Sequence, residues 1–183
     1  MNQKSLVFVS LLSVPAFTAA YAEVYLTAPE TVKVMYPATA AKFVEQEFTL
    51  SDDEVKKVET ASGESVRDRK LRVWKGPGRE LIFIDRVVGK HDFITYAVAI
   101  EPADARNTVP RVHQVEILEY RETYGGDVRK VDWRAQFVGK TRDAKLKAGQ
   151  DIRNLSGATL SSAHVTAGVR RLLQTYEVVH GRG

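Results

Sequence analysis

The C-terminal part of the chain has the clearest hydrophobic pattern, because apolar side chains recur there at intervals of three and four residues. This stripe consists of Val165, Val169, Leu172, Leu173 and Tyr176. A helix has about 3.6 residues per turn, so the spacing places the stripe on one side of an amphipathic helix. We predict that the helix begins within residues 159–162 and buries the stripe against a sheet, with Arg170, Arg171 and Gln174 turned away.

Between Lys70 and Tyr120 the pattern changes to the period of two that is typical of strands. Turn-forming residues separate four predicted strands, at residues 71–74, 81–88, 93–100 and 112–120. Their connections are too short for crossover helices, so we predict an antiparallel sheet of about four or more strands. With the C-terminal helix, this gives an α+β fold in which helices pack on the sheet.

The last predicted strand, residues 112–120, presents two faces. Strict alternation assigns one face to Val112, Gln114, Glu116, Leu118 and Tyr120, and the other to His113, Val115, Ile117 and Glu119. One of these two faces is expected to pack on helices.

The elements on either side of the sheet are shorter. Residues 23–66 are predicted to be an N-terminal helical segment of the same domain as residues 67–183, with a strand within residues 42–50. Its two helices are expected to begin at capping boxes, in which a hydroxyl residue precedes a glutamate by three positions: Thr27 with Glu30, and Ser51 with Glu54. After the sheet, a short helix is expected to place Trp133 and Phe137 on one side.

The first 22 residues have the pattern of a secretory signal peptide. Lys4 precedes an apolar run at residues 6–12, and Ala20 and Ala22 are small residues at the positions that determine cleavage. The run is shorter than the roughly 20 residues of a membrane helix, so an uncleaved anchor is the weaker alternative. We expect cleavage after Ala22, a periplasmic location, and no transmembrane segment in the mature chain.

Composition narrows the possible chemistry. The chain of 183 residues has no cysteine, which excludes a thiol nucleophile, iron–sulfur ligation and haem attachment. The formal net charge of +4 is small and its basic residues are interspersed with acidic ones, so we expect no nucleic-acid partner. The four histidines lack metal-site spacing and no Gly-x-Ser-x-Gly elbow occurs, so no metal and no catalytic residue are assigned.

The stretch DIRNLSGATLSS, residues 151–162, is rich in small and hydroxyl-bearing residues. It leads into the C-terminal helix, whose first N–H groups carry partial positive charge and favour an anion such as phosphate. Gly157 and Ala158 would leave the backbone accessible, and the candidate hydroxyl donors are Ser156, Thr159, Ser161 and Ser162. The alternative is structural, with Thr159 or Ser161 serving only as the N-cap of the helix.

This stretch and the following Val165-Thr166-Ala167-Gly168-Val169-Arg170 closely resemble the signature of the FMN-binding domain family. The family includes flavin subunits of sodium-pumping NADH:quinone reductase and of the Rnf complex, and many small exported proteins. The resemblance covers about residues 120–176. It implies that a flavin transferase, using FAD as donor, esterifies the last hydroxyl of the Ser-Gly-Ala-Thr motif to the phosphate of FMN. That hydroxyl belongs to Thr159.

The resemblance also implies a wider set of residues around the FMN. Besides Thr159, the cofactor-binding set consists of Ser156, Gly157, Ala158, Leu155, Leu160, Ser161, Ser162, Glu122, Tyr124 and Trp133. Tyr124, Trp133 and Leu155 are candidates for contact with the isoalloxazine ring, although core packing is an alternative role for the last two. Arg153 is a candidate to stabilise the negative charge of the reduced flavin. It stands where respiratory members commonly have an acidic residue, and the nearest acid here is Asp151.

The predicted function is that of an exported electron carrier with covalently bound FMN. Its expected partners are the flavin transferase and a redox partner protein or membrane electron-transport complex. Two alternatives are a flavin-dependent reductase of a small acceptor, and an accessory binding module that keeps the fold without the flavin.

Overall fold

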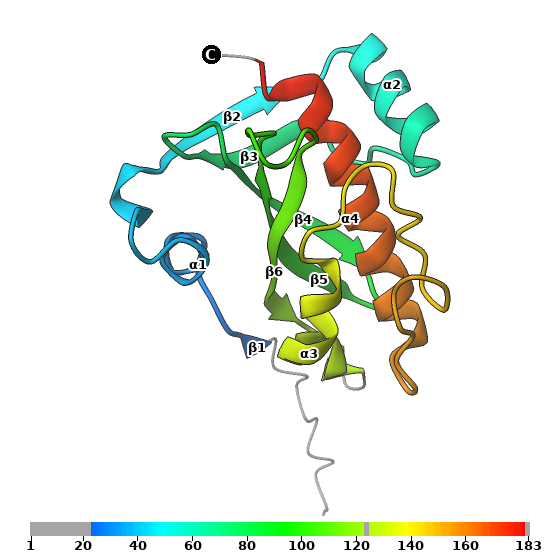
Figure 1. The fold of residues 1–183 in the computed structure, drawn as a ribbon. Coiled ribbons are helices and arrows are strands. Elements are labelled where there is room, and N and C mark those ends of the chain that lie inside the picture. The colour runs from blue at the N-terminus through cyan, green and yellow to red at the C-terminus, as the bar shows by residue number, and fades with distance from the viewer. Residues whose placement is uncertain (1–22, 123–124, 182–183) are drawn as a thin grey trace, which may run out of the picture.

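The computed structural model describes residues 23–122 and 125–181, which fold around one six-stranded antiparallel sheet (Figure 1). The strand order is β1-β6-β5-β4-β3-β2. The bounds are Glu23–Val24 (β1), Val44–Thr49 (β2), Lys70–Lys75 (β3), Leu81–Val88 (β4), Phe93–Glu101 (β5) and Arg111–Tyr120 (β6). Strands β3 to β6 are consecutive neighbours, which confirms the predicted antiparallel sheet and the α+β class.

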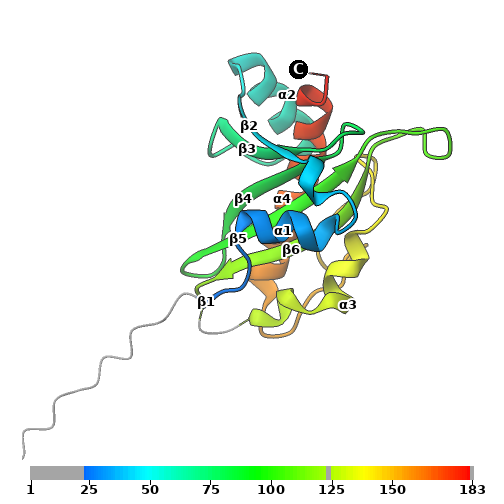
Figure 2. The same ribbon diagram turned by 90° about the vertical axis from the view of Figure 1, so that its left-hand side faces the viewer.

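Helices lie on both faces of the sheet. Helix α4 (Thr159–Val179) crosses one face and α1 (Ala28–Met35) the other (Figures 1 and 2). Helix α2 (Asp52–Ser62) packs beside α4, where Arg170 Nε donates to the Ser62 carbonyl oxygen at 2.8 Å. As the capping boxes predict, Thr27 and Ser51 are the N-caps of α1 and α2. Within the described ranges, no helix combines the length and the apolarity that crossing a membrane requires.

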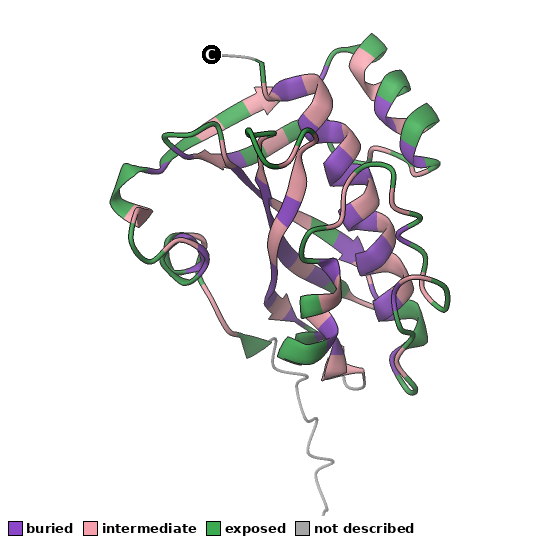
Figure 3. Cartoon of the chain, in the orientation of Figure 1, coloured by how far each residue is buried: buried purple, intermediate pink, exposed green. Residues whose placement is uncertain are grey.

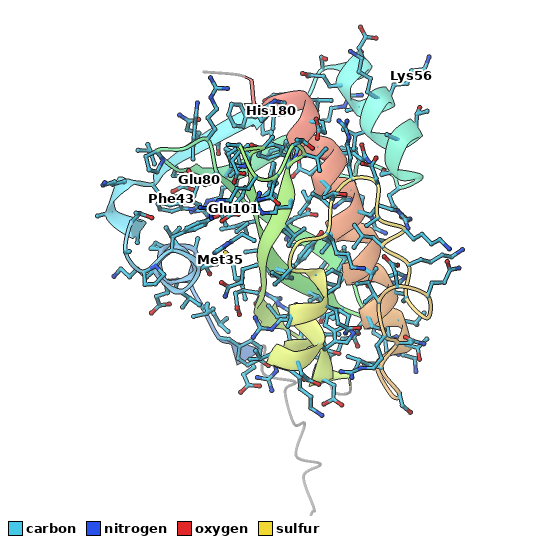
Figure 4. All side chains as sticks on the ribbon, viewed as in Figure 1. Met35, Phe43, Lys56, Glu80, Glu101 and His180 are labelled. Atoms are coloured by element: carbon cyan, nitrogen blue, oxygen red, sulfur yellow. The ribbon has the colours of Figure 1, made fainter. Side chains whose placement is uncertain are left out.

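Two apolar cores hold these layers together. The larger core lies between α4 and the sheet and includes the whole predicted stripe of α4. The smaller core, on the α1 side, includes Met35, Phe43 and Leu118, of which the first two are labelled in Figure 4. Buried residues are concentrated in β4, β5, β6 and α4, whereas α2 is mostly exposed (Figure 3). Because each fully buried large apolar side chain contributes about 1.5–3 kcal/mol, the contact of α4 with the sheet dominates stability.

The short helices in the segment between β6 and α4 pack against β6 and add Val128, Trp133 and Phe137 to the larger core. This segment contains the short helices η2 (Gly126–Arg129), α3 (Val131–Arg134) and η3 (Ala135–Phe137); a fourth short helix, η1 (Ala40–Lys42), precedes β2. The rings of Trp133 and Phe137 meet edge to face with centroids 5.1 Å apart, so their predicted proximity is confirmed. Leu146 and Ile152, from the loop that follows, are fully buried in the larger core.

The strict alternation predicted for β6 is wrong. Val115 and Ile117 belong to the larger core together with Val112 and Tyr120, whereas Leu118 belongs to the smaller core. The pairing of β6 with β5 shifts register twice, skipping His113 and Leu118. Each extra residue moves the side chains that follow it to the opposite face of the sheet, which a period of two cannot anticipate.

The prediction that Arg171 turns away from the core is wrong. Its side chain is only 11% exposed, pairs with the Asp85 carboxylate of β4, and donates to the Ser65 carbonyl oxygen at 3.0 Å. Tyr96 of β5 donates to the same carboxylate at 2.7 Å. A buried charge is costly unless it is paired and hydrogen-bonded, so Arg171 is tolerated on this side of α4 because Asp85 faces it.

Close approach of α4 to β5 requires a glycine at position 168, and replacing it by alanine should destabilise the fold. A Cβ at Gly168 would lie 2.8 Å from Tyr96 Cζ and closer still to its hydroxyl. We expect Gly168→Ala to lower the free energy of unfolding by about 1–3 kcal/mol through overpacking, despite the better helix propensity of alanine. Urea unfolding followed by tryptophan fluorescence measures this change.

The matched control is Gly126→Ala. A Cβ there would meet its nearest heavy atom at 3.7 Å, and the glycine has no left-handed conformation. This variant should stay within about 0.5 kcal/mol of wild type. Equal stability of Gly168→Ala and wild type would contradict the close-packing argument.

Candidate functional site

Helix α4 begins without a side-chain cap. Its N-cap is Ala158, with φ and ψ of −131° and 28°, and a methyl group has no oxygen to accept a hydrogen bond. The first helical residue is Thr159, inside the predicted range, but the alternative that Thr159 or Ser161 is the N-cap is wrong. The first N–H groups of a helix have no intrahelical acceptors, and the macrodipole adds partial positive charge, so this end of α4 favours an anion.

The turn before α4 is built from small residues for two different reasons. Gly157 has a φ of +78°, a left-handed conformation that favours glycine, and no heavy atom of the described chain lies within 4 Å of the place of a Cβ. Ala158 is buried against Gly125, where a Cβ would lie 3.1 Å from Ala158 Cβ and 2.7 Å from the Tyr120 hydroxyl oxygen. Gly157 therefore leaves the backbone accessible, whereas Ala158 is small because Gly125 packs on it.

A pocket of about 760 Å³ opens at this end of α4. Three segments line it: the turn between β4 and β5, the segment after β6, and the turn that leads into α4. The lining residues are Lys90, His91, Glu122, Gly125, Asp127, Ser156, Gly157, Ala158, Thr159, Leu160 and Ser161. Because cofactor pockets typically measure about 300–1,000 Å³, the predicted motif forms one wall of a cavity of suitable size.

Three of the four predicted hydroxyl donors line this pocket. Ser156 and Thr159 are exposed, and the Thr159 hydroxyl lies 3.5 Å from the Leu155 carbonyl oxygen, at the limit of a hydrogen bond. Ser161 is largely buried, and its hydroxyl oxygen lies 3.2 Å from the Tyr120 hydroxyl oxygen. Burial raises the pKa of Tyr120, which keeps that hydroxyl protonated at neutral pH.

Ser162 does not contribute a donor to the pocket, contrary to the prediction. Its side chain is fully buried, and its hydroxyl donates to Asn154 Oδ1 at 2.7 Å. This hydrogen bond holds the preceding loop against the first turn of α4. The role of Ser162 is therefore structural.

The three predicted contacts for the isoalloxazine ring have different outcomes. Trp133 is fully buried in the larger core, where its Nε1 donates to the Arg153 carbonyl oxygen at 2.8 Å, so a flavin in the pocket cannot reach its ring. Leu155 is half-buried, packs against the same core and is not among the lining residues. Tyr124 lies outside the described residues. Core packing, the alternative role for Trp133 and Leu155, is the one that the structure supports.

Arg153 is not the cation of the pocket. Its guanidinium pairs with Asp132 of α3 at 2.8 Å on the exposed surface, and it does not line the cavity. The basic side chains that do line it are those of Lys90 and His91, from the β4–β5 turn. Sequence reasoning missed both, because only strand pairing brings this turn beside the start of α4.

Glu122, predicted to bind the cofactor, lines the pocket, but its carboxylate accepts hydrogen bonds from the backbone of the β4–β5 turn. Its Oε1 accepts hydrogen bonds from the N–H groups of His91 at 2.5 Å and Asp92 at 3.0 Å. Partial burial opposes ionisation, yet these bonds and one from the Lys90 N–H lower the pKa of Glu122 below its usual value. Glu122 is thus a charged clamp that joins the segment after β6 to the β4–β5 turn.

Asp151 organises the loop that precedes the motif. Its two carboxylate oxygens accept hydrogen bonds from Lys147 N at 2.9 Å and Leu146 N at 3.1 Å, and Lys140 Nζ lies 3.3 Å away. Partial burial works against ionisation, but these donors lower the pKa of Asp151 below its usual value. The carboxylate therefore stabilises the fold above the unfolded pKa of about 4, and this contribution is lost as the pH falls through the lower, folded pKa.

We expect Asp151→Asn to destabilise the protein at pH 7 by about 1–3 kcal/mol, because hydrogen bonds to a charged acceptor are lost. The deficit should shrink as the pH falls below about 4. Urea unfolding at several pH values measures both effects. The control is Asp143→Asn in the same loop, whose carboxylate is 75% exposed and should show neither effect. A deficit that did not change with pH would contradict the assigned role of the charge.

No cluster of three or more histidine, aspartate or glutamate side chains in the described residues is arranged to hold a metal ion. A search of curated proteins finds no match. Residues 89–174 match the family model for the FMN-binding domain. The matched region begins at the β4–β5 turn, ends within α4, and so contains every residue that lines the pocket. Residues 89–174 of this protein are therefore similar to the FMN-binding domain.

Proposed function

We propose that this protein is an electron-transfer protein that carries FMN as a phosphoester of the Thr159 hydroxyl. The observation that carries the proposal is the position of Thr159, which is exposed at the first residue of α4 and lines the pocket. Its hydroxyl oxygen makes only a marginal contact, at 3.5 Å, with the Leu155 carbonyl oxygen. A hydroxyl held so loosely is available as the acceptor of a phosphoryl group.

The residues around Thr159 fit the phosphate of FMN. The first N–H groups of α4 offer donors with partial positive charge, and the hydroxyls of Ser156 and Ser161 line the same pocket. The open space beside Gly157 leaves room for phosphate oxygens. Leu160 is 46% exposed and lines the pocket, so it offers apolar surface to the ring system.

Attachment requires a group transfer from FAD, which a flavin transferase would catalyse. A bond forms between Thr159 Oγ1 and the phosphorus of the FMN half, and the pyrophosphate P–O bond to the AMP half breaks. AMP leaves, and the proton of the threonine hydroxyl passes to a base of the transferase or to water. A metal ion of the transferase would stabilise the charge that develops on the phosphates. This chain contributes an accessible hydroxyl flanked by small residues.

FMN supplies one- and two-electron redox chemistry when bound. The protein's part is to retain and orient the cofactor, for which a covalent bond replaces tight binding. Retention matters most outside the cytoplasm, where a dissociated cofactor is lost, and this agrees with the proposed signal peptide. Residues 1–22 lie outside the described residues, so export and cleavage after Ala22 are part of the proposal. The redox partner would be a periplasmic protein or a membrane electron-transport complex.

Attachment at Thr159 is tested by co-expressing the chain with a flavin transferase. We expect wild type to retain flavin fluorescence on a denaturing gel and to show one added FMN, less one water, in its intact mass. Thr159→Ala should lose both signals because the acceptor oxygen is gone, whereas Ser156→Ala should keep them. Thr159→Ser, which restores a hydroxyl, should recover part of the adduct.

A fluorescent adduct on Thr159→Ala would overturn the assignment. The same mass spectrum tests export, because the secreted form should begin at Glu23. Turnover of a small acceptor by the flavin-loaded protein would favour the reductase alternative over a carrier. A colourless wild-type protein in the presence of active transferase would favour the accessory module.

A further inference from the structure

The turn between β4 and β5, residues 89–92, lines the same pocket as Thr159 but belongs to a different part of the fold. It places Lys90 and His91 at the cavity wall. On the other wall, the start of α4 and the hydroxyls of Ser156 and Ser161 already offer donors to the phosphate. The basic side chains of the turn can therefore interact with the rest of the cofactor, which includes the isoalloxazine ring.

The acidic side chains of this pocket have partners within the protein, whereas the Lys90 ammonium group has no ion-pair partner among the described residues. Of its two acidic residues, Asp127 pairs with Lys130 at 3.1 Å and Glu122 is hydrogen-bonded by backbone N–H groups of the turn. Lys90, by contrast, forms no ion pair with any residue in the described part of the chain. Its ammonium charge is thus available to a ligand in the pocket.

The turn is held in one conformation. Within it, the Gly89 N–H donates to the Asp92 carbonyl oxygen at 2.7 Å, and the Glu122 carboxylate accepts from the N–H groups of His91 and Asp92. A Cβ at Gly89 would lie 2.6 Å from Glu122 Oε1, so only glycine leaves this carboxylate in place. The positions of Lys90 and His91 therefore depend on a glycine and on a glutamate about thirty residues away.

We propose that Lys90 and His91 stabilise the negative charge that the flavin gains on reduction, and that Glu122 is the residue that positions them. Positive charge near a flavin favours its reduced state and raises its reduction potential, and the effect is larger in a cavity than in water. This inference rests on the proposed function, because it assumes FMN attached at Thr159. It assigns control of the flavin's reduction potential to the β4–β5 turn.

The charge is tested with Lys90→Gln and His91→Gln on the flavin-loaded protein. We expect Lys90→Gln to weaken the preference for the reduced flavin about tenfold, which for a two-electron couple lowers the midpoint potential by about 30 mV. His91→Gln should shift the potential in the same direction. The matched control is Lys56→Gln, which removes an exposed lysine charge on α2, away from the pocket (Figure 4), and should leave the potential unchanged. Spectroelectrochemical titration measures all four proteins.

The positioning role is tested with Gly89→Ala, which keeps every charge but displaces the Glu122 carboxylate from the turn. This variant should lower the potential, as Lys90→Gln does. Glu122→Gln retains an oxygen that can accept both N–H bonds, so its potential should not fall. A purely structural role for the clamp would change the unfolding midpoint of Gly89→Ala and leave the potential unaltered.

A flavin-loaded Lys90→Gln with the wild-type potential would overturn the inference and leave the proposed function intact. If unloaded Lys90→Gln also bound free FMN more weakly, the lysine would instead serve the phosphate. Absence of FMN from wild-type Thr159, read from the intact mass, would instead overturn the proposed function itself.

Discussion

The packing of α4 against the sheet is the interaction on which the rest of the structure depends. Gly168 lets the helix approach Tyr96, and the Arg171–Asp85 pair requires one rotation of α4 about its axis, since a buried charge must meet its partner. The apolar stripe then fills the larger core. Because the motif is the first turn of this same helix, the packing that stabilises the fold also determines where Thr159 lies.

The pocket exists because three segments that are distant in sequence meet at the start of α4. Strand pairing brings the β4–β5 turn beside the end of β6, and the Glu122 carboxylate joins the two. Gly125 allows the segment after β6 to approach Ala158 closely. One wall therefore carries helix N–H groups and hydroxyls, and the other carries the basic side chains of Lys90 and His91.

Local patterns predicted the elements well because they depend on neighbouring residues alone. Capping boxes marked the starts of α1 and α2, and turn residues separated the strands. The errors arose where distant residues decide the outcome. The bulges of β6 place Val112 and Tyr120 in the same core as Val115 and Ile117, and Asp85 makes it possible to bury Arg171. The sequence also cannot tell whether a hydroxyl or aromatic side chain binds a ligand or packs inside the protein. Ser162 and Trp133 have suitable chemistry for ligand binding, but both are fully buried.

The sequence by itself determined the fold class, the helix that carries the motif, and the threonine at its start, because helical periodicity and a contiguous motif are local properties. Only the tertiary structure decided which residues share the pocket with that threonine. It placed Lys90 and His91 in the pocket lining and paired Arg153 with Asp132 instead, and it joined the Glu122 carboxylate to the β4–β5 turn. The physical reason is that a cavity wall is made by strand register and helix packing, which join residues that no local pattern connects.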